Sequence, residues 1–490
     1  MTPTNTTPDR KRWAALYVLC AGMLMIVLDA TIVNVALPSI TTDLHFSQSN
    51  LAWVVNAYLI AFGGLLLLAG RIGDLVGQRR VFLVGLTVFT TASLACALAA
   101  SQWMLIVARF VQGVGGAMTS AVILGMIVAM FPEPRELAKA IGVYGFVASA
   151  GGSIGLLAGG VLTSAISWHW IFLINVPIGV VTGVLAVKYV VAPAPAARGK
   201  GADTVSAILL TAGLMLGVYT IVKASDQSAT QTLSLGAAAV ALLVVFVVRQ
   251  TRTANPLMPL RLFRSRNVTG ANIVQGLLVV GMFGTFFLGA LYLQEVRGYG
   301  PLRVGLAFLP ATLVMGAMSL RLAAPVQARF GVYRTVLASL VLLVIGLVLF
   351  VRTPVDGSYL TDVMPALAVI GLGAGLGFPA LTTLAMSTAT PSDSGLASGL
   401  MNTTVQVGGA VGLAVLATLS SGRTGHLAAA GTNHAAALTG GFHLAYIVAA
   451  ALAGVAFVAA IIILRPAKSG AADAAEPAPV DNEISELIAA

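Results

Sequence analysis

Long apolar stretches separated by short polar segments run along almost the whole chain. A membrane-spanning helix needs about 20 consecutive apolar residues. Fourteen stretches have approximately this length: 13–37, 51–70, 81–101, 103–130, 140–164, 170–191, 204–223, 231–249, 269–293, 303–324, 333–351, 361–386, 396–420 and 442–464. The pattern therefore predicts an all-α integral membrane protein with 14 transmembrane helices.

The composition excludes a soluble globule. Only 9% of the 490 residues are charged and 58% are apolar, whereas roughly 25% of a soluble domain is charged. Cys20 and Cys96 both fall inside apolar stretches, which gives neither a disulfide framework nor metal-ligand spacing. The first apolar stretch continues past Asp29 to about Pro38 without a cleavage site, so we expect a retained span and not a signal peptide.

Lysine and arginine gather on one side of the predicted membrane. Cytoplasmic loops retain these residues, and exported loops are depleted of them. With the N-terminus inside, 21 of the 27 fall in cytoplasmic segments, Arg109 is intramembrane, and the outer segments hold Lys223, Arg297, Arg303, Arg352 and Arg423. We expect a multi-pass protein of the cell (cytoplasmic) membrane with both termini cytoplasmic. The net charge of +10 then reflects topology and not binding of nucleic acid.

The two halves of the chain repeat one another. The segment Gly70–Arg80 after the second span aligns with Ala324–Arg334 after the tenth, with Gly77 over Gly331. Both copies enter the membrane from the same side, which describes parallel repeats about an axis along the membrane normal. The predicted domains are a cytoplasmic N-terminus (1–12), a first six-helix bundle (13–191), two inserted transmembrane helices (204–249), a second six-helix bundle (269–464) and a disordered acidic cytoplasmic tail (465–490).

Four sequence motifs occur in order at particular spans: Leu28–Pro38 in the first span, Gly70–Arg80 after the second, Arg109–Gly113 in the fourth and Trp168–Gly179 at the start of the sixth. On these motifs the chain resembles the 14-span drug:proton antiporters of the major facilitator superfamily. The resemblance implies the major facilitator fold, with two inserted helices between its bundles, and multidrug export by alternating access. It also implies that Asp74 acts as a latch between the halves.

Two positions depart from the family motifs. Leu156 stands where the motif of the fifth span usually has proline, so the source of a local kink is missing there. Gln78 replaces the first basic residue of the loop motif, whereas Asp74, Arg79 and Arg80 remain.

Two charges lie deep in the predicted spans. Asp29 is the only carboxylate well within a span of the first half, and Arg109 is the only basic residue deep in any span. A charge at the bilayer centre costs at least ~2.5–3.5 kcal/mol, so such residues usually mark ion or substrate pathways. Arg109 precedes Gln112 by three residues, which places both on one helix face. We expect Asp29 to carry the coupling proton and Arg109 to exchange partners with it; the alternative is that both only brace the fold.

Aromatic and amide side chains in the spans are candidates for a cavity that binds lipophilic or cationic molecules, because aromatic faces attract cations. These candidates are Asn34, Trp53, Asn56, Tyr58, Gln112, Gln275, Phe283, Phe286, Phe287, Tyr292, Phe378, Asn402 and Gln406. At helical spacing, such residues are also common in the core or against lipid. Candidates for gating are Gly70, Asp74, Gly77, Arg79 and Arg80, for which membrane anchoring is the alternative role of the arginines.

A stripe of small residues completes the gating candidates. Gly151, Gly155 and Gly159 recur every fourth residue and permit close helix contact. We expect this stripe to pack the fifth span against a helix of the second half. His426, His434 and His443 are expected in or at the end of the outer loop before the last span, as solvated residues.

The sequence lacks the signatures of several other functions. It has no phosphate-binding loop, no acid cluster for a metal and no Cys/His constellation. We therefore expect no cofactor and no enzymatic activity, and expect an ion gradient to supply the energy. The expected partners are protons, lipophilic or cationic small molecules and the bilayer, and the expected state is a monomer. The alternatives are a dedicated exporter of one endogenous metabolite or siderophore, a lipid-modifying membrane enzyme, and a channel.

Overall fold

The computed structural model describes residues 9–131, 133–190, 203–224, 227–253, 256–257, 260–386 and 394–464. The predicted tail and the first part of the N-terminal segment lie outside these residues. Within them the elements are all helical: α1 (Asp9–Leu44), α2 (Gln48–Val76), α3 (Gln78–Ala97), α4 (Gln102–Met130), α5 (Pro134–Ala165), α6 (Trp170–Leu173), α7 (Asn175–Tyr189), α8 (Thr204–Lys223), α9 (Ala229–Arg252), the 3-10 helix η1 (Leu260–Arg264), α10 (Arg266–Leu291), the π-helix η2 (Tyr292–Val296), α11 (Pro301–Ala317), the π-helix η3 (Met318–Leu322), α12 (Ala323–Phe330), α13 (Val332–Val351), the π-helix η4 (Tyr359–Val363), α14 (Met364–Met386), α15 (Ser394–Ala429) and α16 (His434–Ile463).

The predicted count of membrane-spanning helices is confirmed. Thirteen helical stretches in the described part of the chain are long and apolar enough to cross a bilayer. The fourteenth is α5, which has 32 residues and is apolar over Ile154–Ala165. Several spans combine consecutive elements, such as α6 with α7 and α10 with η2.

Most helices extend beyond the predicted apolar stretches, so most loops are shorter than expected; an exception is α3, which ends at Ala97 and not at 101. Ser47 and Ser101 begin α2 and α4 by accepting hydrogen bonds from backbone N–H groups of the first turn. At the other end of the chain, α15 reaches Ala429 and α16 begins at His434. His426 and His434 are exposed, as expected, but they lie in helices and not in a loop. The expectation of a solvated loop residue is wrong for His443, which lies in α16 with its Nε2 atom 2.8 Å from the carbonyl oxygen of Thr353.

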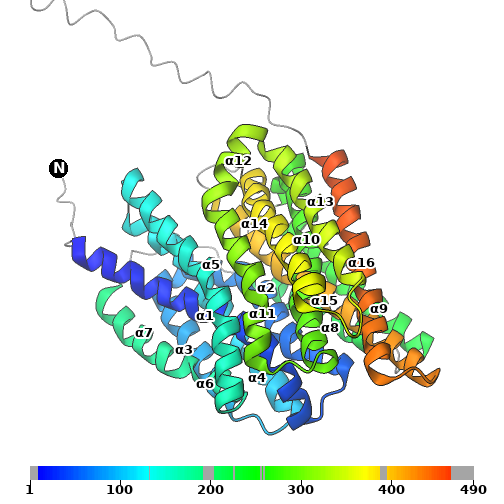
Figure 1. The fold of residues 1–490 in the computed structure, drawn as a ribbon. Helices are drawn as coiled ribbons and strands as arrows, with labels where there is room; N and C mark the ends of the chain where they lie inside the picture. Colours follow the sequence, from blue (N-terminus) through cyan, green and yellow to red (C-terminus); the bar gives the residue numbers. More distant parts are fainter. Residues whose placement is uncertain are drawn as a thin grey trace, which may run out of the picture.

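The helices form two bundles with α8 and α9 at one side (Figure 1). In the first half α1 packs on α5 and α7, and α4 packs on α2 and α3; in the second half α10 packs on α14, α15 and α16. The halves meet where α2 contacts α15 and where α5 contacts α11. The inserted helix α8 contacts α2 and α15, so it touches both halves.

The α8–α9 hairpin is joined by a polar cluster at one end. Asp203 caps α8 and accepts hydrogen bonds from Arg249 of α9, whose Nη2 atom lies 3.0 Å from Oδ1. Gln250 donates to the hydroxyl of Ser206, which in turn donates to Asp203. Burial opposes ionisation of Asp203, but the hydrogen bonds from Ser206 and Arg249 outweigh it and hold the pKa of this carboxyl below its usual value.

The predicted repeat is visible in the backbone. Gly77 separates α2 from α3 with a φ of 109°, and Gly331 separates α12 from α13 with a φ of 82°. Each glycine N–H donates to the carbonyl four residues earlier, at 2.9 Å to Gly73 and 2.8 Å to Gln327. Glycine is favoured at both junctions because a side chain disfavours positive φ.

The α5 helix corrects one expectation. It runs unbroken from Pro134 to Ala165 past Leu156, as the missing proline allows. The stripe of Gly151, Gly155 and Gly159 faces α1 of the same half, because methyl groups added there would meet Val27, Thr31 and Ile32. The expected contact with a second-half helix is thus wrong for this stripe.

A different pair of glycines serves the contact between the halves. A methyl group at Gly160 would lie 2.7 Å from the Cα atom of Leu302, and one at Gly305 would lie 2.5 Å from the carbonyl oxygen of Leu156. Here α5 and α11 approach at backbone distance. The helical positions 151, 155 and 159 follow one face of α5, whereas residue 160 lies about 100° around the helix from residue 159, which explains why one stripe could not serve both contacts.

The two ends of the molecule differ. We call the end where α1 begins and α16 ends the terminal end, and the opposite one the distal end (Figure 1). At the distal end the halves are tied: Nε2 of Gln294 donates to the carbonyl of Val35 at 2.9 Å, and the N–H of Leu302 donates to Oγ of Ser164 at 3.1 Å. Toward the terminal end, α5 and α1 lean away from α11 and α12 in Figure 1.

Candidate functional site

The two deep charges of the sequence form an ion pair inside the first half. The Nη1 atom of Arg109 on α4 lies 2.6 Å from Oδ2 of Asp29 on α1, and the two side chains are 1% and 0% exposed. An unpaired charge at this depth would be strongly unfavourable. The pairing therefore explains how two ionisable groups can remain inside the helix bundle.

The second carboxylate oxygen of Asp29 is bound by two amides. Its Oδ1 atom accepts hydrogen bonds from Nε2 of Gln112 at 2.8 Å and from Nδ2 of Asn175 at 3.0 Å. These donors come from α4 and α7. The carboxylate thus connects three helices of one bundle, so a change in its charge would be felt by all three.

Arg109 has partners of its own. Its Nε donates to the carbonyl of Val54 at 2.9 Å, and its Nη1 also donates to Oε1 of Gln112 at 2.7 Å. The guanidinium carbon lies 4.4 Å from the ring centroid of Tyr58 and 5.6 Å from that of Phe172. A cation over an aromatic face is stabilised by the ring quadrupole. Arg109 can therefore keep several contacts when Asp29 loses its charge.

Three members of this network, Ser93, Cys96 and Asn175, were not predicted as site residues from the sequence. Oγ of Ser93 accepts from the amides of Gln112 and Asn175, both at 3.0 Å, and donates to the carbonyl of Phe172 at 2.9 Å. Cys96 donates to Oε1 of Gln112 at 3.6 Å. Asn175 belongs to the motif Trp168–Gly179, and its amide within an apolar span could have marked it as a candidate. Ser93 and Cys96 offered none, because small polar side chains are common in spans.

The local sequence of α4 brings Arg109 to its place. A spacing of three residues puts Arg109 and Gln112 on one face, and Gly113 follows directly. A methyl group at Gly113 would collide with the carbonyl oxygen of Tyr58. Glycine at this position therefore lets α4 approach α2 closely enough for Arg109 to reach the backbone of Val54.

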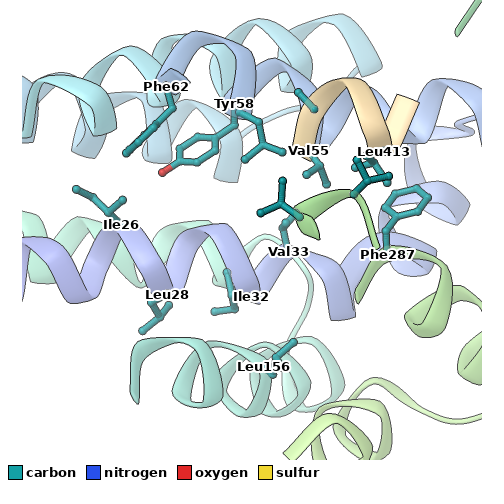
Figure 2. Packing of buried hydrophobic residues seen from close by; sticks show 14 of the residues in the cluster. Ile26, Leu28, Ile32, Val33, Val55, Tyr58, Phe62, Leu156, Phe287 and Leu413 are labelled. Atoms are coloured by element: carbon teal, nitrogen blue, oxygen red, sulfur yellow. The ribbon is translucent and has the colours of Figure 1, made fainter. Parts of the chain in front are cut away.

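Apolar side chains from both halves meet where the halves are in contact. Figure 2 shows Val33 of α1, Val55 of α2, Phe287 of α10 and Leu413 of α15 gathered between the halves, while Tyr58 extends from α2 toward α1. We call these four residues the apolar plug. Each of them is at most 4% exposed. These four side chains keep water out of this part of the contact between the halves.

Several candidates for substrate binding belong instead to the network or the core. Tyr58 and Gln112 contact Arg109. Tyr292 donates its hydroxyl to the carbonyl of Pro354 at 2.7 Å, and Phe287 belongs to the plug. Asn34 donates to carbonyls of its own helix.

The other candidates divide by exposure. Asn56, Gln275 and Trp53 are buried, and the amides of the first two make no hydrogen bond among the described residues. Those at least partly exposed are Phe283, Phe286, Phe378, Asn402 and Gln406. Among these, Phe286 packs on Phe308 with centroids 5.3 Å apart, and Gln406 lies where α15 meets Gly63 of α2.

The loop between α2 and α3 lies at the terminal end. Arg79 donates to the carbonyl of Val187 on α7 at 2.6 Å, which ties the loop to its own half. Gly70 lies near Ala121 of α4, and Arg80 is exposed. Asp74 is partly buried and makes no hydrogen bond or ion pair with the described residues. Within the same residues, no group of three or more His, Cys, Asp and Glu is arranged to hold a metal ion.

Comparison with known proteins gives consistent matches. A family profile described as Major Facilitator Superfamily matches residues 19–413. A puromycin resistance protein of Streptomyces alboniger is 38% identical over 95% of this chain and 94% of its own. A cephamycin export protein of Amycolatopsis lactamdurans is 37% identical over 89% and 91%, and the multidrug resistance protein Stp of Mycobacterium tuberculosis is 32% identical over 84% and 76%.

The fold has solved counterparts as well. A bacterial homologue of the human lysosomal transporter Spinster, solved in an inward-facing and unoccupied conformation, superimposes with a TM-score of 0.67 over 94% of this chain and all of its own, at 16% sequence identity. At that identity the likeness concerns the fold alone.

Proposed function

The chain belongs to the Major Facilitator Superfamily, and on that premise we propose that it exports lipophilic or cationic drugs and other toxic compounds in exchange for protons. Two of the relatives named above are a puromycin resistance protein and a cephamycin export protein, and this chain spans more than nine tenths of each. The family consists of transporters, so the protein is a multi-pass membrane transporter and not an enzyme.

The observation that carries proton coupling is the buried Asp29–Arg109 pair. A proton on Asp29 removes the charge that Arg109 neutralises at 2.6 Å. Arg109 then retains Gln112 and the carbonyl of Val54, while the bond between α1 and α4 weakens. Because a cationic substrate and a proton both neutralise the same carboxylate, the binding of one favours release of the other. This competition is the physical basis of an exchange.

Alternating access is supported by the asymmetry of the two ends. The distal end is closed by the bonds Gln294–Val35 and Leu302–Ser164. The distribution of Lys and Arg along the sequence favours cytoplasmic termini. We infer that the molecule is closed toward the outside and faces the cytoplasm, and that a single chain suffices for function because the whole network lies within it.

The latch at Asp74 belongs to the opposite state. Asp74 has no partner among the described residues, and it lies in the last turn of α2. In the outward-facing state we propose that Asp74 meets the N-terminus of a second-half helix, where the helix dipole stabilises an acid. Gly77, with its positive φ, fixes the direction in which the loop leaves α2.

A second candidate is export of one endogenous metabolite. The name of the cephamycin export protein, to which this chain is 37% identical, describes a dedicated exporter. A panel of structurally unrelated lipophilic cations distinguishes the two functions: a multidrug exporter moves several of them, whereas a dedicated exporter moves none or one.

The proposal is tested in proteoliposomes with an acidic lumen. Wild type should accumulate the lipophilic cation ethidium, and Asp29→Asn should abolish accumulation driven by the pH gradient. Asp43→Asn is the matched control, because Asp43 accepts a hydrogen bond from Trp168 at the distal end, outside the charge network. Gradient-driven transport that survives in Asp29→Asn would disprove the coupling role.

A further inference from the structure

A cavity lies at the distal end, within the second half and on elements separate from the charge network. Its volume is about 610 Å³. Its walls are the segment that joins η2 to α11, the first turns of α11, and the segment that joins α13 to η4. The side chains that matter for its chemistry are Arg297, Tyr299, Arg303, Leu306, Asp356 and Leu360.

Arg303 is stacked on the ring of Tyr299. Its guanidinium carbon lies 3.9 Å from the ring centroid of Tyr299, so the planar group is stacked on the aromatic face. Stacking occupies one face of the guanidinium and leaves its N–H edge available. No carboxylate in the described part of the chain pairs with Arg303. That edge has the geometry to bind two oxygens of a phosphate side by side.

Arg297 adds a second cation in a fixed position. Its Nη1 atom donates to the carbonyl of Val355 at 2.9 Å, which fixes Arg297 to the opposite wall of the cavity. The other N–H groups of the guanidinium can then bind a ligand. Both arginines stand beside the N-terminus of α11, a helix of 17 residues whose dipole also favours an anion. They are two of the five basic residues predicted for the outer segments, where arginine is depleted.

The cavity also contains a group of the opposite sign. Asp356 lines it and forms no ion pair with either arginine or any other described residue. An uncompensated carboxylate beside two uncompensated guanidinium groups matches a ligand that carries both signs. A phosphate with an attached ammonium group has this pattern.

The cavity has an exposed apolar rim. Leu306 and Leu360 line it and are 48% and 64% exposed. Both belong to helical stretches that can span the membrane. Exposed apolar side chains at this level suit acyl chains in the bilayer.

We propose that this distal cavity binds a phospholipid with an ammonium-bearing headgroup: the phosphate contacts Arg303 and Arg297, the ammonium contacts Asp356, and the acyl chains leave past Leu306 and Leu360. The site requires neither proton coupling nor drug export, so it stands or falls independently of the proposed function.

The test measures lipid binding to the purified full-length protein by native mass spectrometry. Phosphatidylethanolamine and phosphatidylglycerol are titrated separately, and glycerophosphoethanolamine serves as the same headgroup without chains. Wild type should prefer phosphatidylethanolamine, and loss of one charge-assisted contact in Arg303→Gln should weaken its binding about tenfold or more. Asp356→Asn should remove the preference over phosphatidylglycerol.

Arg423→Gln is the matched control, because Arg423 is an exposed arginine of α15 that does not line the cavity. It should bind lipid as wild type does. If Arg303→Gln fails to fold, Tyr299→Leu removes the stacking partner and should weaken binding in the same direction. Equal binding of the two lipids by wild type, equal losses in Arg303→Gln and Arg423→Gln, or equally tight binding of the chain-free headgroup would overturn the proposal.

Discussion

Replacing Arg109 with methionine isolates the energy of the buried ion pair. Methionine has a similar length but no charge, so Arg109→Met leaves Asp29 with two amide donors and no cation. Breaking a buried pair by removing one partner destabilises a protein by about 3–5 kcal/mol. The variant also leaves the carbonyl of Val54 without its side-chain donor. We expect the melting temperature to fall by roughly 5 °C or more.

The informative variant is the double one. Asp29→Asn combined with Arg109→Met removes both charges while Asn keeps an oxygen for the amides of Gln112 and Asn175. Residues in direct contact show coupling energies of about 0.5–3 kcal/mol. The double variant should therefore lose less stability than the two single variants lose in sum. It should also be clearly more stable than Arg109→Met.

The molecule supplies its own probe for this measurement. Cys20 and Cys96 are free and buried, so a dye that becomes fluorescent on reaction with thiols reports their exposure on unfolding. Wild type, both single variants and the double variant are heated under identical conditions in detergent. If the losses of unfolding free energy in the two single variants add up to the loss in the double variant within about 0.5 kcal/mol, the two groups act independently. That result would refute the reasoning.

Two further predictions concern packing and pH. Gly113→Val should abolish stable expression, because the valine side chain would collide with the carbonyl oxygen of Tyr58. Gly152→Ala should express normally, since nothing lies within 4 Å of a methyl group there. Gel filtration of the two variants checks this, and a well-folded Gly113→Val would contradict it. The α8–α9 hairpin should lose stability below about pH 4. The pKa of Asp203 is held below its usual value of 3.8 in the folded state, and acid removes the charge that Arg249 binds. Hydrogen exchange of α8 measured against pH reports this loss of stability, and the pH dependence should be absent in Asp203→Asn.

Much of the fold follows from the sequence because the bilayer imposes a simple rule. Every backbone polar group in the lipid must be paired within its own segment, so apolar stretches of sufficient length must be helices. This rule predicts the spans. The repeat at Gly77 and Gly331 follows from the similarity of the two loop segments. The lengths of α15 and α16 could not, because a helix can continue beyond the lipid through residues of any polarity.

The candidate site was partly predictable for a related reason. Charges are so costly in lipid that Asp29 and Arg109 stand out in a chain with 9% charged residues. Uncharged polar residues carry no such penalty, so Ser93 and Cys96 gave no signal. Their roles depend on α3 lying beside α4 and α7, which only packing decides.

The glycines of α5 show the same division. The sequence alone determined that Gly151, Gly155 and Gly159 form a smooth face, because the helical period is fixed. Only the tertiary structure decided that this face meets α1 and that Gly160 with Gly305 joins the halves. A sequence determines which residues share a face of a helix and which must be paired in lipid. The partner of each face depends on how all the helix surfaces fit together, and no single segment holds that information.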